Sequence, residues 1–407
     1  MSDTAADFDR LTAILAGRGL PAGTLTETEW DRLVALAARH DVAPLLYATL
    51  EQRAFRVPPA VGDALRKAYL ASAARSLCLS HELRQVLTSL KAARIPVIVL
   101  KGACLAESVY EDIALRPMGD ADLLVRRSDV ASALETLQGT GHVPAAPLDA
   151  AAEQTINDSA ALSRPGGMRI DLHWTVVTPR YHGPFGEGDL EGLWARANPW
   201  TVAGVPVLIL SPTDLLLHLC MHASVFHRFG ELMLRSFLDM ARVADRHRGT
   251  IEWDQFCARA NRWGIANGVH LALRLATEWT DLAVPESALA ALEADSVDEG
   301  TVEWARLKVL NGASPGMESE AVRLFGGAGL RDHALLLRVA AGPFLGFAGR
   351  VRREPGNAWR GLRGYSVRLM GTLVREGSAA WKLVRRDQSS AADARREARL
   401  REYLGWR

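Results

Sequence analysis

The chain has 407 residues, of which 48% are hydrophobic and 23% charged, proportions typical of a globular protein and not of a disordered or fibrous one. The formal net charge of +1 conceals an asymmetry, because residues 335–407 carry 16 Lys and Arg against 6 Asp and Glu. The net charge of this stretch is therefore +10, and the net charge of residues 1–334 is −9. The four cysteines form no CxxC pair, which argues against a disulfide framework or a zinc knuckle.

No basic and apolar leader opens the sequence, and the longest apolar stretch, 335–348, is too short and too interrupted to span a bilayer. We therefore expect a cytoplasmic protein with two or three domains and no transmembrane segment. The first 93 residues predict helices. Thr26 and Glu29 have the spacing of a capping box, and a second helical pattern runs from 61 to 93 without proline. We expect an N-terminal helical region over residues 1–93.

The periodicity changes after this region. Short runs rich in β-branched residues predict strands, and Gly166 and Gly167 resemble a hairpin turn that leads into one of them. The predicted strands span residues 95–100, 120–125, 169–174 and 205–210, and helices are expected at 103–110 and 128–137. Residues 94–210 thus predict an α/β core.

The rest of the chain is predicted to be helical. Ser211 to Asp214 has the residues of a helix start, and further helical patterns follow at 232–245, 253–263, 266–277 and 287–295. We expect a helical substrate-binding region over 211–330 and a basic helical tail over 331–407. The predicted fold class is α+β, with a small mixed β-sheet that bears the site, flanked by N- and C-terminal helical regions.

Asp120 and Asp122 lie two residues apart in a predicted strand, so their carboxylates project from the same face of the sheet. Such carboxylates repel unless a cation lies between them, and oxygen ligands favour Mg²⁺ or Mn²⁺ over zinc. If the strand 169–174 pairs beside the first, Asp171 supplies a third carboxylate. Three carboxylates that hold two metal ions are suited to phosphoryl or nucleotidyl transfer.

Gly102 directly follows the predicted strand 95–100 and precedes a helix. A glycine in this place lets the backbone approach a phosphate, toward which helix N–H groups point. Lys101 can contact a triphosphate, although a surface lysine at a strand end is the alternative. Arg116, four residues before Asp120, is a second candidate phosphate contact.

Five residues are candidate acceptor contacts. His173 lies on the same strand face as the third aspartate, and an ordinary hydrogen-bonded histidine is the alternative. His218 and His222 lie four residues apart on one helix face, but zinc is disfavoured because further ligands are lacking on that face. Arg235 and Asp239 share a helix face with Arg242, where an intrahelical ion pair is the default and substrate positioning the alternative.

Together these segments resemble the uncharacterised nucleotidyltransferase family of the polymerase-β-like nucleotidyltransferase superfamily. The resemblance is carried in the core by residues 97–102, Tyr110, Arg116, 120–125 and 170–174, and outside it by 30–47, 234–239 and 251–253. It covers about residues 25 to 290.

The resemblance implies a small nucleotidyltransferase core. It implies that Gly102 forms the phosphate turn, that Asp120 and Asp122 bind both metal ions, and that Asp171 binds metal and activates the acceptor. This chain departs from the better-studied relatives, which carry Gly-Ser at the turn where it has Gly102 and Ala103. The hydroxyl that would bind the γ-phosphate is therefore missing.

We predict Mg²⁺- or Mn²⁺-dependent transfer of a nucleoside monophosphate from an NTP to a hydroxyl or phosphate of a small-molecule or peptide acceptor, with release of pyrophosphate. The alternative is a non-catalytic nucleotide- or partner-binding protein on a degenerate nucleotidyltransferase scaffold. The basic tail leaves three options open, since it suits an anionic membrane, a nucleic acid or the acidic body of the protein itself.

Overall fold

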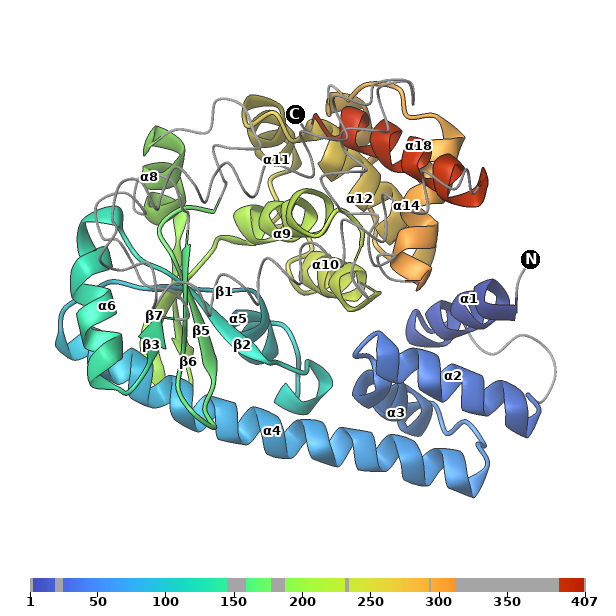
Figure 1. The fold of residues 1–407 in the computed structure, drawn as a ribbon, viewed down its shortest axis with the longest axis horizontal. Coiled ribbons are helices and arrows are strands. Elements are labelled where there is room, and N and C mark those ends of the chain that lie inside the picture. The colour runs from blue at the N-terminus through green and yellow to red at the C-terminus, as the bar shows by residue number, and fades with distance from the viewer. Residues whose placement is uncertain are drawn as a thin grey trace, which may run out of the picture. The chain divides into compact units, whose positions relative to one another are not determined.

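The computed structural model describes residues 3–18, 25–144, 159–176, 187–230, 234–292, 294–311 and 388–405 (Figure 1). The chain divides into two compact units. The first comprises residues 1–228 and 232–295, and the second comprises 229–231 and 296–407. Most of the predicted basic tail, residues 331–387, lies outside the described residues. The division into four regions at 93, 210 and 330 remains a prediction.

The N-terminal part of the first unit is helical, as predicted. It consists of α1 (Asp3–Leu15), α2 (Glu27–Arg39), α3 (Ala43–Gln52) and the 34-residue α4 (Pro59–Ala92). The predicted capping box is confirmed, because the Thr26 side chain accepts from the backbone N–H of Glu29 while the Glu29 carboxylate accepts from the backbone N–H of Thr26. Helices α2 and α3 pack on α4, and α4 also packs against α6 and the sheet (Figure 1).

The sheet of the described residues has seven strands in the order β3-β4-β5-β2-β1-β7-β6. Their bounds are β1 (Ile98–Leu100), β2 (Asp120–Leu124), β3 (Val143–Pro144), β4 (Ser159–Ser163), β5 (Arg169–His173), β6 (Asn198–Val202) and β7 (Val205–Ile209). The β2–β5 and β1–β7 pairs are parallel and the others antiparallel. The predicted α+β class with a small mixed sheet is therefore confirmed.

Three strands were not predicted from the sequence. β6 is an edge strand that contains a proline and an exposed tryptophan, so it lacks the alternation of a half-buried strand. It pairs with β7 across Ala203 and Gly204, which both have positive φ angles, of 49° and 75°. β3 has two residues only, and β4 pairs with β5 across the turn at Gly166, whose φ of 68° agrees with the predicted hairpin.

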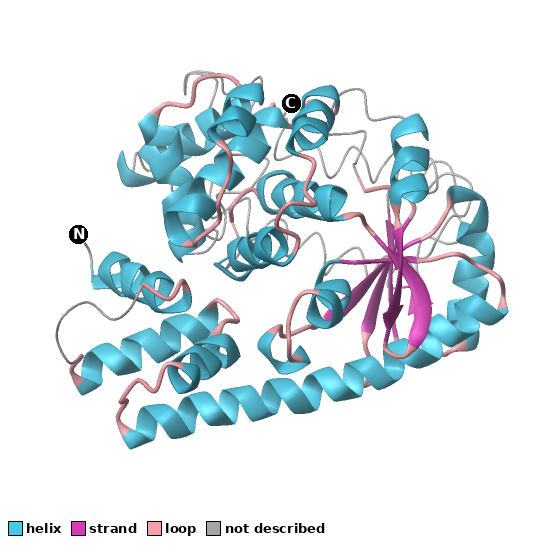
Figure 2. Ribbon diagram, turned by 180° about the vertical axis from the view of Figure 1, so that it is seen from behind, coloured by secondary structure: helices cyan, strands magenta, loops and turns pink. Residues whose placement is uncertain are grey.

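One face of the sheet packs in the apolar core, and the other carries charged side chains beside buried apolar ones such as Leu100 and Leu124. Val99, Leu123 and Leu172 are among the fully buried residues of the apolar core, to which α4, α5 (Lys101–Ser108) and α6 (Val130–Gly139) contribute. Figure 2 shows α4 and α6 beside the magenta strands. The opposite face carries the acidic and basic side chains of β2 and β5, so the alternation of each strand separates the core from the candidate site.

Helix α8 (Glu187–Arg196) lies between β5 and β6 in the chain. The helices after the sheet are α9 (Pro212–Met221), α10 (Leu234–Arg246), α11 (Trp253–Arg262), α12 (Ala266–Trp279) and α13 (Glu286–Ala291). A π-helical turn, residues His222–Phe226, continues α9. In the second unit, α14 (Glu299–Asn311) packs on α18 (Gln388–Tyr403), where the buried Glu397 accepts from Trp304 Nε1 at 3.0 Å and Lys308 Nζ at 2.8 Å.

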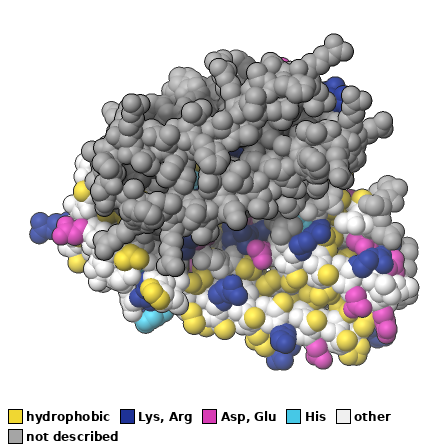
Figure 3. All heavy atoms as spheres, in the orientation of Figure 1, with side chains coloured by type: hydrophobic (Ala, Val, Ile, Leu, Met, Phe, Trp, Pro, Cys, Tyr) yellow, Lys and Arg dark blue, Asp and Glu magenta, His cyan; other side chains and the backbone are white. Residues whose placement is uncertain are grey.

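The surface of the described residues is mixed in character. Figure 3 shows basic and acidic side chains interspersed with apolar ones over the described part of one face. Among the helices that the structure describes, none combines the length and the apolar character needed to cross a bilayer.

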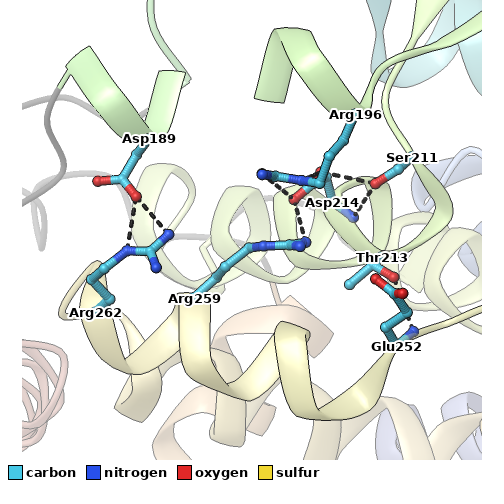
Figure 4. Close-up of polar contacts among 8 residues, drawn as sticks. All are labelled: Asp189, Arg196, Ser211, Thr213, Asp214, Glu252, Arg259 and Arg262. Atoms are coloured by element: carbon cyan, nitrogen blue, oxygen red, sulfur yellow. Dashed lines mark hydrogen bonds and ion pairs between the residues drawn. The ribbon is translucent and has the colours of Figure 1, made fainter. Parts of the chain in front are cut away.

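A buried aspartate joins three helices of the first unit (Figure 4). Asp214 on α9 accepts from Arg196 Nε of α8 at 2.8 Å, from Arg259 Nη1 of α11 at 2.8 Å and from Ser211 Oγ at 2.8 Å. The Asp214 side chain is fully buried, and that of Arg259 is only 5% exposed. Arg196 also donates from Nη2 to Oδ1 at 3.3 Å, so the two guanidiniums share this oxygen.

We predict that Asp214→Asn lowers the free energy of unfolding by about 3–5 kcal/mol. The reason is that Arg196 and the buried Arg259 lose the carboxylate that they share. Urea unfolding followed by circular dichroism measures the change. Asp245→Asn is the matched control, since Asp245 pairs with Arg248 at 2.7 Å while both side chains are more than 70% exposed. Its cost should stay below about 1 kcal/mol, and an equal loss in both variants would contradict the prediction.

Candidate active site

The three predicted aspartates lie on two adjacent strands. β2 and β5 pair in parallel, with Asp120 opposite Arg169, Asp122 opposite Asp171, and Leu124 opposite His173. The condition set by the sequence, that the two strands be neighbours, is met. The residues of β5 alternate as expected, since Ile170 and Leu172 are fully buried while the three polar residues face the other side. The acidic groups thus share one face of the sheet.

Asp122 lies at the centre of this face and is 5% exposed. Its Oδ1 accepts from Lys101 Nζ at 2.6 Å and lies 2.9 Å from His173 Nε2. Burial alone would raise the pKa of Asp122, but the hydrogen bond from His173 and the charge of Lys101 outweigh it and hold the pKa well below its usual range. Asp122 is therefore ionised in the ligand-free chain.

The other two carboxylates differ in their surroundings. Asp171 accepts from Arg169 Nε at 2.8 Å. The pKa of Asp120 is raised by burial and then by the charges of Asp122 and Asp171, and Lys101 offsets this only in part. The three carboxylates thus repel one another, and negative charge is in excess at Asp120.

The chemistry of this face suits a hard cation, because carboxylates are the ligands that Mg²⁺ and Mn²⁺ prefer. As the side chains stand, no three acidic, histidine or cysteine side chains within the described part of the chain are close enough together to hold a metal ion. The bonds from Lys101 and His173 to Asp122 account for part of this. Metal binding by Asp120, Asp122 and Asp171 remains a prediction.

The glycine turn lies at the start of α5, where Lys101 is the first helical residue and has a positive φ of 46°. A Cβ on Gly102 would come within 3.2 Å of Arg116 Nη1, a tight contact. The close approach that a glycine permits here is thus to the guanidinium of Arg116. Lys101, predicted to contact a triphosphate, extends to Asp122 in this structure, and its phosphate contact remains a prediction.

Arg116 and Asp239, which the sequence places far apart, form one buried cluster. Arg116 Nε lies 3.0 Å from both carboxylate oxygens of Asp239, and Tyr110 Oη donates to Asp239 Oδ1 at 2.8 Å. The intrahelical ion pair expected between Arg235 and Asp239 is wrong. Arg235 Nη1 donates instead to Asp41 Oδ2 at 2.9 Å, because α10 turns Asp239 toward the buried guanidinium of Arg116.

Two of the predicted histidines lie near the acidic face. His218 is 4% exposed, and neither ring nitrogen has a hydrogen-bond partner in the described structure. Burial, and after it the charge of Lys101, lower the pKa of His218 to about 3, so this ring is neutral at pH 7. His222 begins the π-helical turn, a feature found often at functional sites, and its Nε2 lies 3.1 Å from His227 Nε2. Their contact with an acceptor remains a prediction.

Sequence reasoning missed two features of this region. It did not foresee the bond between Lys101 and Asp122, which joins residues 21 positions apart. It also did not connect Asp41 with Arg235, although both lie in segments that carry the family resemblance. A hydrogen bond across 194 positions leaves no pattern in a single sequence.

A comparison with curated proteins found no match, but a comparison with protein-family models did. The family model described as uncharacterised nucleotidyltransferase matches residues 26–281, which include the whole sheet and the helices that surround the acidic face. The match covers more than half of the chain, which therefore belongs to this family of uncharacterised nucleotidyltransferases.

Proposed function

We propose that the protein transfers a nucleoside monophosphate from an NTP to a hydroxyl or phosphate of a small-molecule or peptide acceptor. The acceptor oxygen forms a bond to the α-phosphorus, the bond from that phosphorus to the bridging oxygen breaks, and pyrophosphate leaves. The observation that carries the proposal is the in-register pairing of Asp122 with Asp171 beside Asp120, next to the Gly102 turn, in a chain of this family.

The residues act by position and charge. Asp120, Asp122 and Asp171 would hold Mg²⁺ or Mn²⁺, which when bound neutralises charge on the phosphates. Asp171 accepts the acceptor's proton, the role that the family resemblance implies for it. Gly102 and Arg116 line the donor side, and the neutral rings of His218 and His222 offer hydrogen bonds to the acceptor without adding charge.

The alternative, a non-catalytic protein that binds nucleotide on the same scaffold, also has an observation in its favour. The turn carries Ala103 in place of a serine, and Lys101 occupies an oxygen of Asp122 that a metal ion would need. The two functions differ in one measurable product. Both bind an NTP with Mg²⁺, but only the transferase releases pyrophosphate.

We predict that the double variant Asp120→Asn with Asp122→Asn loses at least about a hundredfold in NTP turnover, because it removes two of the charges that fix the reacting phosphate. Coupled detection of pyrophosphate with a panel of acceptors and Mg²⁺ measures the rate. Asp63→Asn, at an exposed aspartate on α4, is the surface control and should retain full activity. Turnover that survives in the double variant refutes the transferase assignment.

We predict that the single variant Asp120→Asn melts at a higher temperature than the wild type at neutral pH in the absence of metal. The raised pKa of Asp120 means that its ionised form is disfavoured in the folded state, and the amide removes that penalty. The gain should shrink as the pH falls through the raised pKa, because the wild-type carboxyl then becomes neutral as well. Differential scanning calorimetry from pH 4 to 8 tests this, and a lower melting temperature at neutral pH would contradict it.

A further inference from the structure

Two arginine side chains converge beside the glycine turn. Arg116 Nη1 donates to the carbonyl of Pro117 at 2.9 Å, and Arg235 Nη1 donates to the same carbonyl at 3.3 Å. Arg116 lies against Gly102 and within electrostatic reach of Asp120. A pair of guanidiniums is thus held between α10, the turn and the acidic strands.

The first arginine of this pair is fixed in place. The Arg116 side chain is 8% exposed, and it is bonded to Asp239, which in turn accepts from Tyr110. All the bonds of Arg116 that the structure describes are to groups of the protein, and it therefore positions its neighbours and has little capacity left for a ligand. Asp239 acts through Arg116 and is a positioning residue.

The second arginine is available to a ligand. The Arg235 side chain is 31% exposed, and its partner Asp41 is 60% exposed, so this ion pair is weak. Among the residues that the structure describes, Nε and Nη2 of Arg235 make no hydrogen bond. Burial and then the positive charge of Arg116 lower the pKa of Arg235, and the charges of Asp239 and Asp41 offset this only in part.

Apart from Lys101, which extends to Asp122, the turn offers no polar side chain to an anion. Ala103 is 2% exposed and packs in the apolar core of the sheet, so its Cβ faces away from the polar side. The chain thus lacks a hydroxyl at a place where a guanidinium with free donors lies nearby. Guanidinium groups bind phosphate oxygens through parallel N–H donors, which a single hydroxyl does not provide.

We infer that Arg235 binds the β- and γ-phosphates of the donor nucleotide, and that the carbonyl of Pro117, to which both arginines donate, holds its guanidinium beside that of Arg116. This inference rests on the proposed function for the identity of the anion. It moves Arg235 and Asp239, which the sequence suggested as acceptor contacts, to the donor side of the site.

Isothermal titration of the full-length protein with inorganic tripolyphosphate, without metal and without acceptor, tests the inference. Arg235→Gln should weaken binding about tenfold or more, the effect of one charge-assisted hydrogen bond. Asp41→Asn is the matched control, since it removes the ion-pair partner of Arg235 but leaves the guanidinium free. It should bind tripolyphosphate as tightly as the wild type or more tightly.

Equal losses in the two variants would show that the ion pair with Asp41 is what matters, and would overturn the inference, as would wild-type protein that does not bind tripolyphosphate. Should Arg235→Gln fail to fold, wild-type protein labelled with an arginine-specific dicarbonyl reagent gives the answer by mass spectrometry. Tripolyphosphate should protect Arg235 from the reagent, and a lack of protection overturns the inference.

The two proposals fail in different ways. Binding of tripolyphosphate that depends on Arg235, in a protein that releases no pyrophosphate, supports the anion site and refutes the transferase. Turnover of NTP with an unchanged KM in Arg235→Gln refutes the anion site and leaves the transferase in place.

Discussion

The parallel pairing of β2 with β5 is the constraint on which the site depends. Because the two strands run in the same direction and in register, residues of equal depth lie side by side, and Asp122 meets Asp171. A shift by one residue would turn every polar side chain of β5 into the core and bring Ile170 and Leu172 to the acidic face. Hydrophobic burial on one face therefore fixes the chemistry of the other.

Buried ion pairs organise the helices around this sheet. Asp214 joins α8, α9 and α11, while Asp239 joins α10 to the segment that leads into β2. In both clusters a carboxylate less than 2% exposed faces at least one arginine. Such pairs cost desolvation energy and therefore add little net stability. Their effect is to orient the helices, because each arginine meets its carboxylate in only one arrangement of them.

The sequence predicted the parts of the fold that depend on local pattern. The capping box before α2, the strand of Asp120 and Asp122, and the alternation in β5 follow from spacing alone, and the structure agrees. The edge strand β6 was missed because one side of it is solvated and its pattern is weak. The partners of Lys101 and Asp239 could not be predicted, since the contacts that select them join segments 21 and 123 positions apart.

The bond between Lys101 and Asp122 bears on how such a protein can assemble at all. Three like charges on neighbouring strands oppose folding, and a site that waited for an external ion would be unstable during synthesis. The ammonium group of Lys101, the residue that directly follows β1, serves as a counter-ion to Asp122. Part of the counter-charge of the acidic face is therefore built into the chain.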